Sequence, residues 1–186
     1  DDYFKMAGVK FWYDGSPYTG SMYLNEPFKS SSVNQEKIHV PLGHSGKALW
    51  KNDEIANRIK QYDSVGWQVA VHTQGDRAIS ETLDAFEKSG IPKNSRHRLE
   101  HCLLPSKKDI QRMAKLGVSP SFHINHLWYY GEALEDHIIG RERTDKILPL
   151  KAAENNSLIF SLHADQPMFE SNPLSLLHTA VNRETR

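Results

Sequence analysis

Apolar positions along the chain fall into five short runs separated by stretches with helical spacing. The runs predict β-strands at residues 9–13, 67–72, 97–102, 118–122 and 158–162. Apolar residues that recur every three or four positions predict helices over residues 53–66, 76–90, 106–117, 147–155 and 174–181. Strands that alternate with helices indicate a parallel α/β sheet, because parallel strands need crossover connections. Periodicity alone fits both a part of an eight-stranded barrel and a doubly wound open sheet.

Two segments lack a clear period. Residues 18–51 contain Gly, Ser, Pro and Asn throughout, which predicts a long loop insertion, and such loops in compact domains are usually functional. A second loop, rich in aromatic residues, is expected after the fourth strand, around residues 126–130. Ser106 and Asp109 resemble a capping box at the start of the third helix.

Composition excludes several classes of protein. Lys and Arg together number 23, as do Asp and Glu, so the formal net charge is zero and we expect no nucleic-acid partner. No apolar run approaches the roughly 18 residues of a membrane span. The single cysteine, Cys102, excludes an internal disulfide and fits a reducing, cytoplasmic compartment. A signal peptide preceding this chain would instead indicate a periplasmic or secreted protein.

Both ends of the sequence resemble cut points. The chain starts Asp-Asp-Tyr-Phe without a Met, and its last residues fall within a predicted helix. We therefore expect residues 1–186 to be one piece of a longer catalytic domain.

Three predicted strands end in residues that can bind metal. His72 closes the second strand, His101 lies at the end of the third, and His163 and Asp165 follow the fifth. Functional sites of α/β folds lie at the carboxyl ends of parallel strands, and imidazole and carboxylate suit a borderline ion such as zinc. Each histidine alone is more often a hydrogen-bonded or surface residue, and it is their repetition that indicates a metal site.

Lys10 is unusual because it interrupts an apolar strand. Alternation places Lys10 with Trp12 and Asp14 on one face of that strand. A lysine buried there would lose its charge readily, and a neutral amine can react with carbon dioxide to give an anionic metal ligand. The alternative is a lysine that pairs with Asp14 or extends to the rim.

Four segments together resemble amidohydrolase family 3, the group that includes N-substituted formamide deformylases and exoenzyme-regulatory proteins. They occur in the family's order, as VKFWYDGS at residues 9–16, HTQGDRA at 72–78, RLEH at 98–101 and ADQP at 164–167. The resemblance implies a (β/α)8 barrel of which this chain supplies about strands four to eight. It also implies that Lys10 is a carboxylated bridging ligand, that His72 and His101 bind metal, and that Asp165 is both a ligand and a proton shuttle.

Two departures from the family pattern are visible. The family's first-strand H-x-H pair is absent from this chain, and His123 and His126 form an H-x-x-H after the fourth predicted strand instead. His163-Ala164 stands before Asp165, where the family has a different motif, S-D-x-P.

The resemblance implies a metal-dependent hydrolase of C–N bonds in amides, formamides or cyclic amides, using one or two divalent ions, with zinc expected. His126, Trp128 and Tyr129 are candidate substrate contacts, although an aromatic cluster that only packs over the barrel mouth is an equal alternative. Two other readings remain open, a non-catalytic regulatory or binding protein on the same barrel and an open-sheet domain without metal. We expect the piece alone to be inactive and metal-poor, with an unmodified Lys10, and its two sheet edges to be covered by homodimerisation or otherwise.

Overall fold

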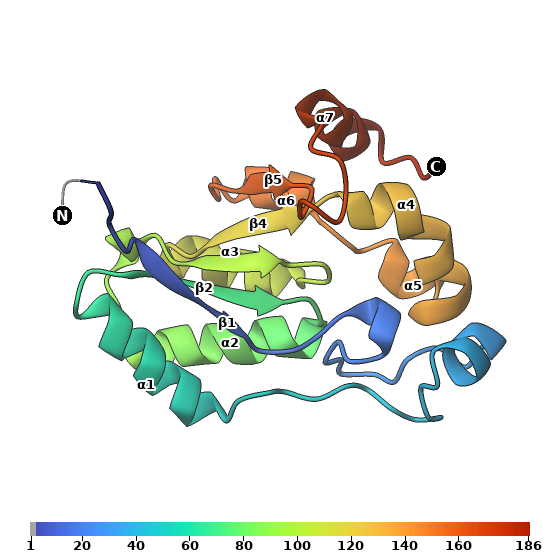
Figure 1. Ribbon diagram of the computed structural model, residues 1–186, viewed down its shortest axis with the longest axis horizontal. Helices are drawn as coiled ribbons and strands as arrows, with labels where there is room; N and C mark the ends of the chain where they lie inside the picture. Colours follow the sequence, from blue (N-terminus) through green and yellow to red (C-terminus); the bar gives the residue numbers. More distant parts are fainter. Residues whose placement is uncertain (1–2) are drawn as a thin grey trace.

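The computed structural model describes residues 3–186, which form one parallel sheet of five strands (Figure 1). The strands are β1 Gly8–Trp12, β2 Gln68–Thr73, β3 Arg98–His101, β4 Ser119–His123 and β5 Ser161–His163. Their order across the sheet is the same as their order along the chain, β1-β2-β3-β4-β5. Every adjacent pair is parallel, so all five carboxyl ends meet at one edge of the sheet.

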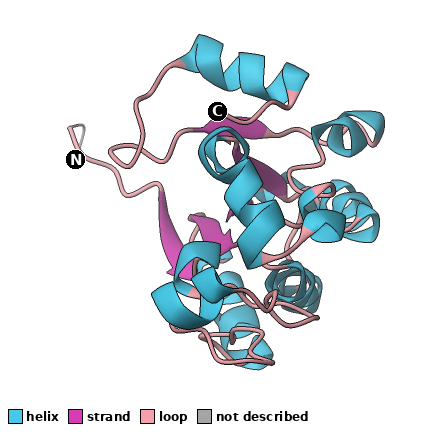
Figure 2. Cartoon of the chain, turned by 90° about the vertical axis from the view of Figure 1, so that its right-hand side faces the viewer, coloured by secondary structure: helices cyan, strands magenta, loops and turns pink. Residues whose placement is uncertain are grey.

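Helices connect the strands, and several of them cover one face of the sheet (Figure 2). They are α1 Asn52–Asp63, α2 Asp76–Ser89, α3 Lys107–Leu116, α4 Asn125–Ala133, α5 Arg141–Thr144, α6 Leu150–Asn155 and α7 Pro173–Asn182. Helix α1 packs on α2, α2 on α3 and α3 on α6, so these helices form a layer in the order of the strands. A doubly wound sheet would carry helices on both faces. The single layer is therefore the arrangement of a barrel segment, and the doubly wound alternative is wrong.

The two faces of the sheet differ in chemistry. The face toward the helices carries apolar side chains that belong to the buried core, including Val69, Val71, Leu99 and Phe122. The register between strands places polar side chains side by side on the opposite, inner face. These inner residues are Lys10, Trp12, Ala70, His72, Arg98, Glu100, Ser119, Ser121, His123, Ser161 and His163. The inner face is therefore built to meet water, ions or polar groups.

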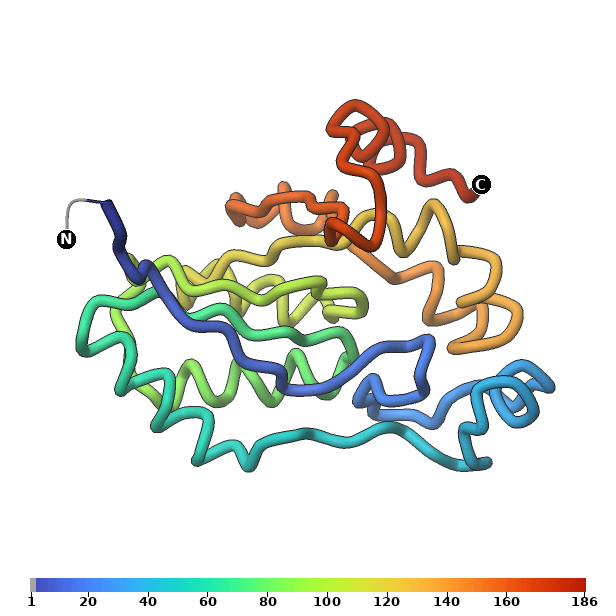
Figure 3. Tube along the Cα trace, in the orientation of Figure 1, coloured from blue at the N-terminus to red at the C-terminus, as the bar shows by residue number. Residues whose placement is uncertain are grey.

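The segment predicted as a long loop, residues 18–51, is mostly irregular but well packed. It contains only two short helical turns, η2 at Val33–Lys37 and the end of η1 at Pro17–Thr19, and it buries Met22, Leu24 and Val40. Figure 3 shows this blue segment running along the molecule to the orange α4–α5 region. A third short turn, η3 Lys93–Ser95, precedes β3.

The aromatic segment after β4 is where the sequence prediction is wrong. We expected a loop, but residues 125–144 form α4, the π-helical turn η4 at Leu134–Ile138, and α5. The Ser106–Asp109 capping box is present, with Ser106 Oγ accepting from the Asp109 backbone N–H at 3.1 Å. No helix in the described residues is both long enough and apolar enough to cross a membrane.

Candidate metal centre

Four strands end in histidines whose rings face one another. His72, His101, His123 and His163 are the last or penultimate residues of β2, β3, β4 and β5. The ring of His101 lies at the centre, with centroid distances of 4.5 Å to His72, 5.7 Å to His123 and 5.0 Å to His163. The carboxyl ends of the parallel strands coincide, which brings His72, His123 and His163 together on the inner face. His101 pairs in register with Phe122, whose side chain faces the helices; the backbone of His101 is left-handed, with φ of 71°, and its ring lies among the other three.

A fifth histidine, His126, joins from the first turn of α4. Its ring is 4.1 Å from that of His123, and its Nδ1 lies 2.5 Å from the hydroxyl of Tyr18 in the long loop. We call His72, His101, His123, His126 and His163 the histidine cluster. The side chains of the cluster are buried or half-buried.

Asp165 approaches the cluster from the turn after β5. Its backbone is left-handed, with φ of 56°, and its carboxylate lies with His101 and His163 in a group whose ligand atoms are all within 4.8 Å of one another. His101, His123 and His126 form a second such group. The two groups share His101.

Lys10 lies on the same inner face but is exposed. Its Nζ is 5.2 Å from the centre of the Trp12 ring, and its charge is near enough to help lower the pKa of both His72 and His163. Asp14 is not its partner, because the Asp14 carboxylate is occupied by backbone N–H groups. Lys10 thus projects toward the cluster without being buried in it.

Asp14 holds together the two loops that frame the cluster. Its buried oxygens accept backbone N–H groups from Tyr23 at 3.0 Å, Gln74 at 3.0 Å and Gly75 at 2.9 Å. Burial raises the pKa of Asp14 to about 7, while these three hydrogen bonds act to lower it. Nε2 of His72 lies 3.8 Å from Asp14 and 3.3 Å from the carbonyl oxygen of Gly15. This network ties the turn that follows His72 to the loop after β1.

Burial keeps the histidine cluster neutral. It lowers the pKa of His72 and of His123 to about 4 and also lowers that of His101, His126 and His163. A neutral imidazole has one ring nitrogen free to accept, which is the form that binds metal. Four such nitrogens are buried without a hydrogen-bond partner, namely His101 Nδ1, His123 Nε2, His126 Nε2 and His163 Nε2. Unpaired buried polar atoms are rare, so this donor set fits a divalent cation.

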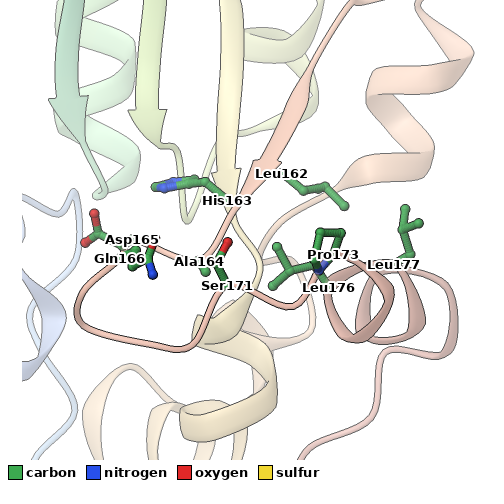
Figure 4. A pocket seen from close by; sticks show the side chains of 9 residues that line it. All are labelled: Leu162, His163, Ala164, Asp165, Gln166, Ser171, Pro173, Leu176 and Leu177. Atoms are coloured by element: carbon green, nitrogen blue, oxygen red, sulfur yellow. The ribbon is translucent and has the colours of Figure 1, made fainter.

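A pocket of about 630 Å³ adjoins the cluster between β5 and α7 (Figure 4). His163 and Asp165 lie on one side of it, and Leu162, Pro173, Leu176 and Leu177 lie on the other. The pocket therefore combines the polar groups of the cluster with an apolar wall.

The candidate substrate residues have separate surroundings. His126 belongs to the histidine cluster, whereas the ring of Trp128 packs edge-on against His178 of α7, with centroids 6.5 Å apart. Tyr129 is 39% exposed and stacks on Phe169, whose ring is 5.5 Å from His123. Of the two aromatic residues, only Tyr129 connects to the cluster, through Phe169.

The sequence places His72, His101, His163 and Asp165 at strand ends, but the ligand set that the family resemblance implies includes neither His123 nor His163. Both histidines stand at the ends of predicted strands. His123 belongs to an H-x-x-H that cannot be the family's first-strand pair, and His163 precedes Asp165 where the family motif is different. Glu100 forms an ion pair of 2.7 Å with Arg98 on the inner face.

A parallel sheet segment with ligand-type residues at the carboxyl ends of its strands has the architecture of part of a (β/α)8 barrel with a candidate metal site, and known proteins of similar sequence and structure were compared with it. A family model described as an amidohydrolase family matches residues 1–186, and the chain belongs to this amidohydrolase family. It is 27% identical to the N-substituted formamide deformylase of Arthrobacter pascens over 88% of the chain. It is 28% identical to Protein LONG AFTER FAR-RED 3 of Arabidopsis thaliana over 96% of the chain.

The same fold is found in a solved structure. An uncharacterized metal-dependent hydrolase from Pyrococcus furiosus superposes with a TM-score of 0.79, at 27% identity over 96% of this chain and 34% of that one. The chain spans 30% of the formamide deformylase and 29% of the Arabidopsis protein. It corresponds to about one third of such a hydrolase barrel.

Proposed function

We propose that this chain supplies part of the active site of a metal-dependent hydrolase that cleaves C–N bonds in amides, formamides or cyclic amides. The observation that carries the proposal is the convergence of the histidine cluster and Asp165 at one edge of the sheet, with four buried ring nitrogens unpartnered. The formamide deformylase relative supports the choice of bond, because its name describes hydrolysis of an N-substituted formamide.

The first cation would be held by His101, His163 and Asp165, joined by His72 and Lys10 as the family resemblance implies. Imidazole and carboxylate ligands favour zinc over harder ions. When bound, such an ion acts as a Lewis acid and lowers the pKa of water to about 7.

The chain's own residues would then move protons and hold the substrate. Asp165 is half-buried beside two neutral imidazoles, so its carboxylate can take a proton from attacking water and pass it to the departing amine. The apolar wall of Leu162, Leu176 and Leu177 suits a hydrocarbon substituent of the amide. Substrate is expected to enter through the pocket between β5 and α7.

The test is to express the intact protein, measure its metal content and assay it against a panel of N-substituted formamides, linear amides and cyclic imides. Asp165→Asn should lower kcat/KM by about 100-fold or more, the usual contribution of a general acid–base group. Asp145→Asn, at an exposed aspartate in α5's C-cap, is the matched control and should match the unaltered protein. Full activity in Asp165→Asn, or after removal of metal, would overturn the proposal. Metal binding without turnover of any C–N substrate would favour a regulatory or binding role.

A further inference from the structure

The H-x-x-H at the end of β4 forms a compact unit that the expected ligand set does not use. His123 is the last residue of β4 and His126 is in the first turn of α4, and the short step from strand to helix brings their rings to 4.1 Å. With His101, their ligand nitrogens lie within 4.8 Å of one another. All three residues are at most 4% exposed.

One nitrogen of each of these two rings is held by an oxygen. Nδ1 of His126 is paired with the Tyr18 hydroxyl at 2.5 Å, and His123 is hydrogen-bonded to the backbone of Ala164. Nε2 of each ring is the nitrogen left buried and unpartnered. Histidines that bind metal typically have this arrangement, in which the second nitrogen is fixed by an oxygen acceptor and the first faces the ion.

Tyr18 is itself suited to hold His126. Its ring is packed at 4.3 Å from Tyr130 and at 5.5 Å from His126, and burial raises the pKa of its hydroxyl, so it stays uncharged. If Nδ1–H of His126 donates to this oxygen, Nε2 is left as the accepting nitrogen. The tyrosine therefore holds the orientation of the His126 ring, and its hydroxyl oxygen can accept the Nδ1–H when a cation takes Nε2.

We propose that His101, His123 and His126 form a second cation position, adjacent to the one at Asp165, with Tyr18 as its positioning residue. His101 belongs to both positions, so when both are filled it would release its ring proton to solvent and bridge the two cations through its two nitrogens. Its three ligands are imidazoles without a carboxylate, a set that selects a borderline ion such as Zn²⁺ or Co²⁺ over Mg²⁺ or Ca²⁺. This position differs from the set implied by the family resemblance, which uses Lys10, His72 and Asp165 with His101.

The competing explanation is that these histidines only fill the core. Core packing would account for the burial of the rings, but it would leave three buried nitrogens unsatisfied at a cost of about 1–3 kcal/mol each. It also gives no reason for one ligand nitrogen from each of the three rings to lie within 4.8 Å of the others. A shared cation accounts for both features.

The experiment measures metal binding by the intact protein without substrate. Metal is removed by a chelator, Co²⁺ is titrated in while visible absorption is recorded, and bound Zn²⁺ is counted by elemental analysis after dialysis. His126→Gln should retain one equivalent fewer than the unaltered protein. Tyr18→Phe keeps the ring, and should weaken binding at this position by about 10–100-fold. His178→Gln, at an exposed histidine of α7, should behave as the unaltered protein.

Unchanged stoichiometry and affinity in His126→Gln would overturn the site, and an unchanged affinity in Tyr18→Phe would overturn the role of the tyrosine. Circular dichroism establishes that each variant is folded. If His126→Gln does not fold, the metal stoichiometry and affinity of His126→Asn and Tyr18→Phe are measured instead and are judged by the same outcomes. Because no substrate is used, loss of amide hydrolysis alone would count against the proposed function and leave this site intact.

Discussion

His97, which lies outside the histidine cluster, is expected to fix the positions of β2 and β3. It is 1% exposed, and its Nδ1 accepts the backbone N–H of Val69 at 2.9 Å, while its ring stacks on Phe86 with centroids 5.6 Å apart. His97→Ala leaves a buried N–H unpaired, which costs about 1–3 kcal/mol, and removes an aromatic pair worth about 0.5–1.5 kcal/mol. We expect the free energy of unfolding in urea to fall by about 2–4 kcal/mol.

His97→Asn is the matched variant, because its side-chain oxygen can take the place of Nδ1. It should recover most of the hydrogen-bond part of the loss, about 1–3 kcal/mol. Equal unfolding free energies for the alanine and asparagine variants would refute the role of the Val69 bond.

The difference from the unaltered protein should also depend on pH. Burial lowers the pKa of His97 in the folded state, so its stabilising contribution is full above the unfolded value of about 6.5 and is lost as pH falls. The unfolding free energy of the unaltered protein should therefore exceed that of His97→Ala by more at pH 8 than at pH 5. A gap that widens toward acid pH would contradict this sign.

Two further substitutions test Asp14, which joins the loops beside the histidine cluster, and Lys10, which lies next to the cluster. Asp14→Ala leaves three backbone N–H groups without their acceptor. The unfolding free energy in urea should fall by at least about 3 kcal/mol. A loss below about 1 kcal/mol would show that water replaces the carboxylate. Lys10→Met should lower the metal content of the intact protein. Its melting temperature should change little, because Lys10 is exposed and its Nζ lies over the Trp12 ring. Unchanged metal content would exclude Lys10 as a ligand.

The fold could be predicted because its signals are local. Each strand is a short apolar run, and turns such as that at Gly117, with φ of 72°, mark where helices end. The expected boundaries differ from the observed ones by a few residues, as for the helix predicted from Ile147, which begins at Leu150. The rule that sites lie at strand ends was enough to select His72, His101 and Asp165.

Helix α4 could not be predicted, because its buried face is not purely apolar. Asn125, His126, Leu127 and Gly131 are its buried residues, and this mixture of polar and apolar groups hides the helical period. His126, which belongs to the histidine cluster, therefore interrupts the apolar pattern by which α4 could be predicted. Functional demands on a buried face are a general reason for such failures.

The long loop before α1 connects the cluster to the rest of the molecule in a way that no local pattern reveals. The side-chain amide of Asn34 donates to the carbonyl oxygens of Lys29, His137 and Ile138 at 2.7, 2.9 and 3.2 Å. Arg143 of α5 donates to the carbonyl oxygens of Glu26 and Pro27 at 2.9 and 2.8 Å. Apart from the bond to Lys29, these bonds join the loop to η4 and α5, at the end of the helical segment that begins at Asn125.

Tyr18 meets His126 although 108 positions separate them in the sequence. The loop is therefore tied to the same helical segment at two places, at η4–α5 through backbone carbonyls and at the start of α4 through Tyr18. If the segment moved relative to the loop, the Tyr18–His126 bond would break and His126 would lose the contact that holds its Nδ1. The loop has little regular secondary structure. It can still hold one ring nitrogen in place, because Asn34 and Arg143 each donate several hydrogen bonds that anchor the loop. The geometry of the proposed second cation position thus depends on residues that are distant from it in the chain.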